Sequence, residues 1–273
     1  MLNVVSLFSG IGAFEKALSN LKIPYNLLAY CEIDKHASKS YSLIHDVSED
    51  LNLKDVTKVD LLDIDERVDL ITYGFPCQDI SNAGKQKGFT DENGERTRSG
   101  LFFEALRIIE EYKPKFAIAE NVKALTSKKF TEEFKIVLDS LDQAGYNNYW
   151  QVLNAKDYGV PQNRERVFII SIRKDIDKGF TFPEPISLEL RLKDLLEDEV
   201  DESFYLSNET LQKSVVNLDP KETIGVDKSV NNPRLIKNAN CITTREDRGV
   251  SNRKAEGTTI VEIYDEIDDF LNS

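Results

Sequence analysis

A cysteine and its neighbours form the strongest candidate for chemistry in this chain. Cys77 belongs to the string Gly-Phe-Pro-Cys-Gln, which follows a short apolar stretch at 70–73. If that stretch is a strand of an α/β sheet, its carboxyl end is where such enzymes place reacting groups. A thiolate is a strong nucleophile once a neighbouring group activates it. Cys31 and Cys241 lack such surroundings, and we interpret both as core residues.

Three charged residues could act beside this cysteine. Glu120 follows an apolar stretch at 116–119, and a carboxylate there could protonate or hydrogen-bond a substrate. A helix cap or a surface acid is an equally good interpretation of its position. Arg164 and Arg166 begin another apolar stretch, so on a strand they would point to the same face. Such a pair could bind a carbonyl or a phosphate, although a salt bridge to acids is the simpler explanation.

A glycine turn near the start of the chain could bind a cofactor. Its residues, Phe-Ser-Gly-Ile-Gly at 8–12, lie between an apolar stretch and a helical pattern, where glycines let a ligand approach the backbone. Glu32 follows the next apolar stretch, and an acid about 20 residues after such a turn commonly binds ribose hydroxyls. The pattern suits a nicotinamide dinucleotide as well as S-adenosylmethionine. A turn needed only for packing is the alternative.

Two basic segments stand out from an acidic chain. The loop at 81–88, Ser-Asn-Ala-Gly-Lys-Gln-Lys-Gly, is suited to closing over a polyanion, and residues 231–254 carry six Arg or Lys against two acids. The whole chain has a net charge of −13, which argues against a protein that coats nucleic acid non-specifically. Any contact with DNA is therefore expected to be local.

The spacing of apolar residues predicts the elements that position these groups. Strands and helices alternate through the first 180 residues, which is typical of an α/β fold with a doubly wound, mostly parallel sheet. The pattern changes near Pro183 and Pro185, so we predict one domain at 1–180 and a smaller, irregular region at 181–259. Strands are predicted at 2–8, 25–31, 70–73, 116–119 and 167–172, and helices at 13–21, 101–112 and 131–144.

Composition excludes several classes of protein. Two histidines and three cysteines, far apart in 273 residues, do not suit a zinc site or a disulfide framework, so no metal is expected. No apolar run approaches the roughly 20 residues that cross a bilayer. The start of the chain also lacks the pattern of a signal peptide. We therefore expect a soluble protein of a reducing compartment.

Taken together, these strings resemble the C5-cytosine-specific DNA methyltransferase family. The resemblance implies a sheet that binds S-adenosylmethionine, with a target-recognition region at 181–259. It also implies methyl transfer to C5 of a cytosine flipped out of a specific double-stranded DNA sequence, in the cytoplasm of a bacterium or by a phage-encoded modification enzyme. The resemblance covers about residues 3–173 in unbroken order: the turn at 8–12, Glu32, Asp60, 74–78, 81–88, 99–109, 120–122 and 162–168.

The resemblance also implies a role for individual residues. Cys77 would add to C6 of cytosine, Glu120 would contact N3 and the exocyclic amine, and Arg166 would bind O2 with Arg164 in support. Glu32 would hold the ribose and Asp60 the adenine amine. The implied cofactor residues are Phe8, Gly10, Ile11, Gly12, Glu32, Ile33, Asp60, Pro76 and Leu101. The implied DNA-binding residues are Gln78, Ser81, Gly84, Lys85, Arg245, Arg248 and Arg253.

The last part of the chain departs from the family pattern. The family would continue with an Arg-x-Leu-Thr-x-x-Glu stretch and a Gly-Asn-Ser segment, whereas residues 260–273 here predict an acidic amphipathic helix. We therefore expect a second polypeptide to supply the missing elements; a truncated chain and a self-sufficient minimal chain are the alternatives. A silent DNA-binding or decoy protein, a tRNA cytosine-5 methyltransferase and a nicotinamide dehydrogenase are the competing functions.

Overall fold

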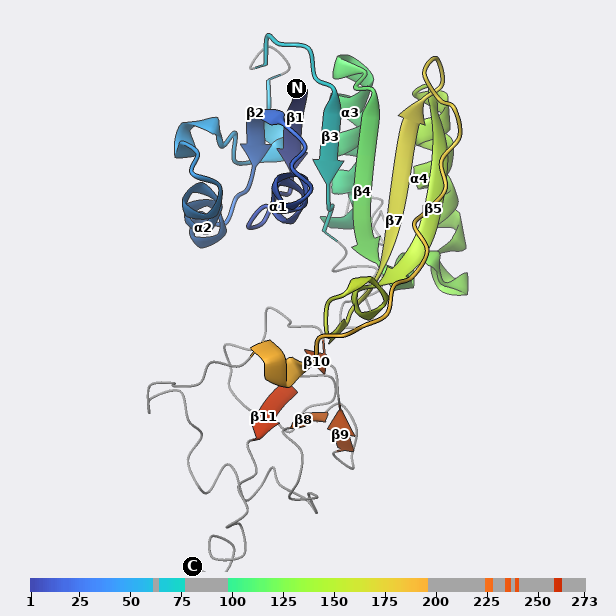
Figure 1. The fold of residues 1–273 in the computed structure, drawn as a ribbon. Helices are drawn as coiled ribbons and strands as arrows, with labels where there is room; N and C mark the ends of the chain where they lie inside the picture. Colours follow the sequence, from blue (N-terminus) through green and yellow to red (C-terminus); the bar gives the residue numbers. More distant parts are fainter. Residues whose placement is uncertain are drawn as a thin grey trace, which may run out of the picture. The chain divides into compact units, whose positions relative to one another are not determined.

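The computed structural model describes residues 1–60, 64–76 and 98–195, and the backbone of four short strands beyond them (Figure 1). The chain divides into two units. The first comprises Met1–Leu153 and Arg166–Phe182, and the second Asn154–Glu165 and Pro183–Ser273.

A six-stranded sheet in the order β2-β1-β3-β4-β7-β5 forms the centre of the first unit. The pairs β1–β2, β1–β3 and β3–β4 are parallel, whereas β7 is antiparallel to β4. The chain passes from β1 to β2 on one side and then to β3 on the other, so the strand order reverses beside β1. The predicted doubly wound, mostly parallel α/β sheet is confirmed. The strands are β1 Leu2–Leu7, β2 Tyr25–Cys31, β3 Leu70–Tyr73, β4 Phe116–Val122, β5 Tyr146–Asn154, β6 Gln162–Asn163 and β7 Glu165–Arg173.

In the part of the chain that the structure describes, four α-helices accompany the sheet, and α3 and α4 lie on the same face of it (Figure 1). One of the four, α2, was not predicted. It buries only Ser38 and Tyr41, so its sequence carries almost no apolar period. Its start is nevertheless well defined, because the Asp34 side chain accepts hydrogen bonds from the first amides of the helix. The α-helices are α1 Ala13–Asn20, α2 Lys35–His45, α3 Phe102–Tyr112 and α4 Thr131–Gln143. The 3₁₀ turns are η1 Glu49–Leu51, η2 Val56–Lys58, η3 Arg98–Leu101, η4 Lys123–Thr126, η5 Lys128–Phe130, η6 Ala155–Tyr158 and η7 Leu192–Leu195.

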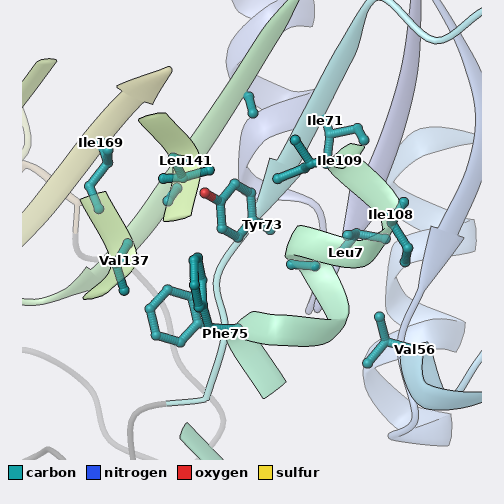
Figure 2. Close-up of a cluster of buried hydrophobic side chains, with 14 of the residues drawn as sticks. Leu7, Val56, Ile71, Tyr73, Phe75, Ile108, Ile109, Val137, Leu141 and Ile169 are labelled. Carbon is teal, nitrogen blue, oxygen red and sulfur yellow. The ribbon is translucent and has the colours of Figure 1, made fainter. Parts of the chain in front are cut away.

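The apolar core joins the sheet to α3 and α4 (Figure 2). Tyr73 and Phe75, at the end of β3, are buried in it with their ring centroids 6.4 Å apart. Phe75 also packs on Phe102 at the start of α3, with a centroid separation of 5.5 Å. Burial of such large rings holds the end of β3 firmly in place. The chain reaches Cys77 two residues later.

Strand boundaries differ from the prediction where the sheet turns antiparallel. β4 does not end at Ala119 but continues to Val122, because β7 pairs with it along its whole length. Glu120 therefore lies inside a strand rather than after one. The whole of β5 also escaped prediction, since its burial pattern shows no clean alternation of apolar and polar residues.

The second unit contains segments that the sequence assigned elsewhere. Residues 154–165 belong to it, whereas the prediction placed them in the domain at 1–180. Hydrogen bonds explain the difference: the Tyr158 hydroxyl donates to Pro183 O at 3.0 Å, and Ile186 N donates to Asp157 O at 2.9 Å.

Short strands form the described backbone of the C-terminal region. They are β8 Ile224–Asp227, β9 Arg234–Ile236, β10 Ala239–Asn240 and β11 Thr258–Val261. β8 pairs antiparallel with β9 and β11, and β10 pairs with β6. Ile260 and Val261 lie in β11, so the helix predicted from residue 260 is wrong at these two positions. Their backbone hydrogen-bonds to β8 instead. Residues 262–273 lie outside the described part.

Candidate functional site

Glu32 connects the glycine turn after β1 to the start of α2. Its Oε2 accepts a hydrogen bond from Gly10 N at 2.9 Å, and its Oε1 accepts one from Asp34 N at 2.7 Å. The Asn52 side chain in turn accepts from Glu32 N at 3.0 Å and donates to Glu32 O at 2.9 Å. The carboxylate is therefore held in one orientation at the carboxyl edge of the sheet.

The turn at 8–12 has an unusual backbone. Phe8 has a φ of 54°, a left-handed conformation that a bulky residue rarely adopts. Such strain persists only where the surrounding structure imposes it, and it often marks a functional site. Gly10 has a φ of 56° and open space where a side chain would be. The turn therefore leaves room for a ligand directly against its backbone.

A histidine packs beneath the same turn. The Nε2 atom of His45 lies 3.0 Å from Ile11 O, and its ring centroid is 4.7 Å from that of Tyr41. Gly12 has a φ of 83°, and a Cβ there would collide with the His45 imidazole. Gly12 is therefore required by packing as well as by its backbone conformation. The sequence excludes a zinc site built on its two histidines but does not predict this contact of His45.

Two large apolar side chains beside the turn are exposed. Ile11 is 55% and Ile33, the residue after Glu32, is 77% exposed. An apolar surface next to a fixed carboxylate and an open glycine suits a nucleoside, which has a flat apolar ring and a polar sugar. Of the other predicted cofactor residues, Asp60 is exposed, whereas Pro76 and Leu101 are half-buried. All nine residues predicted to bind the cofactor lie in the described part.

Glu120 and Arg166 form an ion pair. Their Oε1 and Nε atoms are 2.8 Å apart, and their side chains are only 26% and 19% exposed. Glu120 lies opposite Phe168 on β7, so Arg166 is its diagonal neighbour on the same face of the sheet. The other carboxylate oxygen lies 3.6 Å from the position that a Cβ on Gly74 would occupy. An acid and a guanidinium thus meet beside the backbone that leads to Cys77.

Asn121 supports that backbone from the other face of β4. Its side chain is 3% exposed, its Nδ2 donates to Phe75 O at 3.2 Å, and its Oδ1 accepts from Val122 N at 2.8 Å. Asn121 belongs to the string at 120–122 that resembles the family, but no role was predicted for it. The alternation of a strand was the available signal, because it turns Asn121 inward when Glu120 faces the site.

Burial makes Cys31 a poor nucleophile. Its side chain is 1% exposed, and burial raises the pKa of its thiol to about 12, with the nearby Asp55 and Glu32 carboxylates adding to the effect. The interpretation of Cys31 as a core residue is confirmed. Cys77 and Cys241 lie outside the described residues, as do Gln78, Ser81, Gly84, Lys85, Arg245, Arg248 and Arg253.

Arg164 does not share a strand with Arg166. β7 begins at Glu165, and Arg164 lies between β6 and β7, outside both strands. The Asn154 side chain accepts a hydrogen bond from Arg164 N at 3.1 Å, which holds the backbone there. The expectation that two residues of one strand point to the same face is therefore wrong for this pair. Arg164 also belongs to the second unit and Arg166 to the first.

The described residues contain no cluster of His, Cys, Asp and Glu that could hold a metal ion. Within the same ranges, no helix is both long and apolar enough to cross a membrane.

Comparison with known proteins gives consistent results. The family model for C-5 cytosine-specific DNA methylase matches residues 2–268. Orphan methyltransferase M.SPRI of Bacillus phage SPR is 39% identical over 237 residues, covering 76% of this chain and 53% of the phage protein. Type II methyltransferase M2.ScrFI of Lactococcus lactis subsp. cremoris is 38% identical over 258 residues, covering 76% of this chain and 71% of that protein.

Solved structures agree on the fold. A mutant of Spodoptera frugiperda DNMT2 matches with a TM-score of 0.73 at 18% identity, over 100% of this chain and 78% of that one. The S. pombe Dnmt2 methyltransferase matches with a TM-score of 0.68 at 23% identity, over 100% and 81% of the two chains. The chain spans about half the length of the first curated relatives, 49% and 53% of two phage proteins.

Proposed function

The chain belongs to the C-5 cytosine-specific DNA methylase family, and from that premise we propose that it methylates C5 of cytosine in double-stranded DNA. The Glu120–Arg166 ion pair, beside the backbone that leads to Cys77, is the observation that carries the proposal. S-Adenosylmethionine supplies an electrophilic methyl group when it is bound. The curated relatives named above come from a bacteriophage and a bacterium, so we place the enzyme in the cytoplasm of a bacterium, as part of a modification system.

Covalent addition makes cytosine reactive. C5 is a weak nucleophile until the Cys77 thiolate adds to C6, which places the electron density of the former C5–C6 double bond at C5. C5 takes the methyl group, which leaves S-adenosylhomocysteine as the product; a base from the solvent then removes the C5 proton, the C5–C6 double bond re-forms and the thiolate leaves C6. The cysteine is therefore regenerated, as a covalent catalyst must be.

Glu120 and Arg166 hold the ring in this scheme. Glu120 shares a proton with N3 and accepts a hydrogen bond from the exocyclic amine, and Arg166 donates to O2, so that the donors at N3 and O2 draw electron density away from C6. Their ion pair orients both side chains before the base arrives, and partial burial strengthens its electrostatics relative to a pair in bulk water. Arg164 was predicted to support Arg166; with the pair no longer on one strand, we assign it no direct contact with the base.

The residues at the edge of β1 and β2 fit the cofactor. Glu32 accepts the ribose hydroxyls, the exposed Ile33 and Ile11 offer apolar contact, and Asp60 accepts the adenine amine. The N-terminus of α1 has no side-chain cap, so its amides suit the carboxylate of the amino-acid part. Phe8, Gly10, Gly12, Pro76 and Leu101 complete the proposed pocket.

The target base must leave the duplex, since C6 cannot be reached inside the stack, and unstacking costs a few kcal/mol. We propose that the segment after Cys77 and the basic island at 231–254 contact the DNA. The residues concerned are Gln78, Ser81, Gly84, Lys85, Arg245, Arg248 and Arg253.

The test is transfer of a tritiated methyl group from S-adenosylmethionine to unmethylated DNA, with Cys77→Ala as the control. The proposal expects incorporation that disappears in the variant. A parallel reaction with tRNA separates the RNA-methylating alternative. Incorporation by this chain alone would contradict the prediction of an obligatory second polypeptide. A folded chain that binds DNA yet transfers no methyl group, alone or with such a partner, would favour the decoy function.

A further inference from the structure

Arg107, on α3, hydrogen-bonds to the backbone of the loop that precedes Asp60. Its Nη2 donates to Val56 O at 3.2 Å, and its Nη1 and Nη2 each lie 3.3 Å from Val59 O. Its Nε bonds to Glu104 Oε2 at 3.1 Å, one turn earlier on the same helix. The guanidinium is therefore fixed on one side by an acid and directed on the other at two carbonyls.

The same loop is anchored from inside by its side chains. Val56 is 4% and Val59 is 5% exposed, and both belong to the core cluster, in which Figure 2 labels Val56. Between them lies the short η2 turn. Asp60 comes next and is exposed, so a buried, anchored residue is followed directly by an exposed one.

The carbonyl of Val59 belongs to the same planar peptide unit as the amide nitrogen of Asp60. Fixing that carbonyl therefore also fixes the plane of this peptide unit, and with it the position of the Asp60 Cα atom. A guanidinium fork can hold both carbonyls at once, whereas an ammonium offers only a point charge. Leu101, another proposed cofactor residue, lies at the start of the helix that carries Arg107.

We propose that Arg107 positions Asp60 and thereby sets the selectivity of the pocket for an adenine amine. This inference rests on the proposed function, in which Asp60 accepts that amine. Arg107 is then a positioning residue, which acts on the ligand only through Asp60. Its substitution is expected to weaken only the interaction with the 6-amino group of the adenine.

The experiment compares two ligands by titration calorimetry: S-adenosylhomocysteine and its analogue with hydrogen in place of the 6-amino group. The unmodified chain should bind S-adenosylhomocysteine more tightly than the analogue, because only S-adenosylhomocysteine carries the 6-amino group. Arg107→Gln should raise the dissociation constant of S-adenosylhomocysteine about tenfold, the effect of one lost hydrogen bond. It should leave that of the analogue nearly unchanged. Arg107→Lys should fall between, and Asp60→Ala should show the same selectivity loss.

Arg173 offers a matched control. Its guanidinium also donates to a backbone carbonyl, Lys113 O at 2.6 Å, and pairs with Asp175 at 2.6 Å. It lies at the last residue of antiparallel β7, next to the start of β4 and therefore away from the carboxyl edge of the parallel strands. Arg173→Gln should leave both dissociation constants unchanged.

The outcomes separate the possible failures. Equal weakening of both ligands by Arg107→Gln and Arg107→Lys, or no weakening at all, would overturn the role of Arg107 while leaving the proposed function intact. If Arg107→Gln does not fold, the dissociation constants of the two ligands for Arg107→Lys test the proposal instead. If Asp60→Ala still binds S-adenosylhomocysteine more tightly than the analogue, by the same factor as the unmodified chain, the assignment of Asp60 is wrong and the inference is wrong with it. If the unmodified chain binds neither ligand, the proposed cofactor itself is wrong.

Discussion

Single residues at the carboxyl edge of the sheet have separable tasks. Glu120 pairs with Arg166 on one face of β4, whereas the side chain of its neighbour Asn121 is buried and hydrogen-bonds to the backbone of Phe75. Strand alternation makes this division possible, because consecutive side chains point to opposite faces. Substitutions at the two positions should therefore have different consequences.

Glu120→Gln should lower the rate of methyl transfer at least a hundredfold, since it keeps the shape of the side chain but removes the charge that pairs with Arg166. Single-turnover kinetics measures the rate, and binding of S-adenosylhomocysteine should not change. Asp175→Asn, which breaks an exposed ion pair with Arg173, is the control and should react normally. A Glu120→Gln variant with undiminished rate would remove the carboxylate from the mechanism.

Asn121→Leu should lower both stability and rate. It removes the donor to the buried Phe75 carbonyl, and we expect the free energy of unfolding to fall by about 1–3 kcal/mol. Asn148 also donates to a carbonyl, Leu138 O at 3.2 Å, but it lies on β5, to which no proposed site residue belongs. Asn148→Leu should therefore cost stability in urea titrations without slowing methyl transfer. Equal slowing by both variants would show that Asn121 acts only through stability.

Cys31 should resist alkylation. Because burial raises the pKa of its thiol to about 12, almost none of it is ionised at pH 8, and reagents cannot reach it. Peptide mass spectrometry after brief treatment with iodoacetamide should find Cys31 unmodified in the native chain and modified in urea. Rapid native labelling of Cys31 would contradict the buried position.

At the scale of elements, one acid ties together the amino ends of three parallel strands. Asp69, just before β3, accepts from Asn3 N on β1 at 3.2 Å and pairs with Lys115 before β4 at 3.0 Å. Burial alone would raise the pKa of Asp69, but the Asn3 amide and the Lys115 ammonium outweigh it and hold the pKa below its ordinary value.

This depressed pKa makes the contribution of Asp69 depend on pH. A carboxylate with a lower pKa in the folded state stabilises the fold above its unfolded value of about 3.9, and the gain is lost as the pH falls through the folded pKa. Asp69→Asn should therefore lower the free energy of unfolding by about 1–2 kcal/mol at pH 7. The difference should shrink below pH 4. Urea titrations at pH 7 and pH 3 measure it, and a constant difference would contradict the assignment.

At the scale of the whole molecule, the proposed cofactor residues and the basic island at 231–254 come from different regions of the chain, whereas the DNA-binding candidates at 78–85 share the first region with the cofactor residues. Every predicted cofactor residue lies before Phe182, and the basic island at 231–254 lies after it. The net charge of −13 makes non-specific attraction to DNA weak, so the proposed DNA binding would depend on local basic groups.

A chain ending at Phe182 should keep the sheet and bind S-adenosylhomocysteine as the full chain does, because all six strands of the central sheet are present. Its DNA affinity should be lower than that of the full chain in mobility-shift assays at low salt, because it keeps the proposed contacts at 78–85 but lacks the basic island at 231–254. The full chain's DNA affinity should fall steeply as salt rises, since phosphate contacts release counterions. Undiminished DNA affinity of the short chain would place the recognition surface in the first unit.

The sequence by itself determined the family, the fold class and most parallel strands, because glycine turns, apolar runs and strand-end acids are local patterns. It missed α2 and β5, whose apolar periods are weak, and it extended a helix over Ile260, where pairing with Gly225 makes a strand. At residue 260, backbone pairing with β8 outweighs the helical pattern of the local sequence.

Only the tertiary structure decided which groups meet. Glu120 reaches Arg166 because β7 inserts antiparallel beside β4, and the same register excludes Arg164 from the strand. Asn121 meets Phe75 across 46 residues. Arg107 reaches the loop before Asp60 because α3 packs against it. Such contacts depend on the order and direction of strands in the sheet, which are set by burial of the whole core rather than by any one segment.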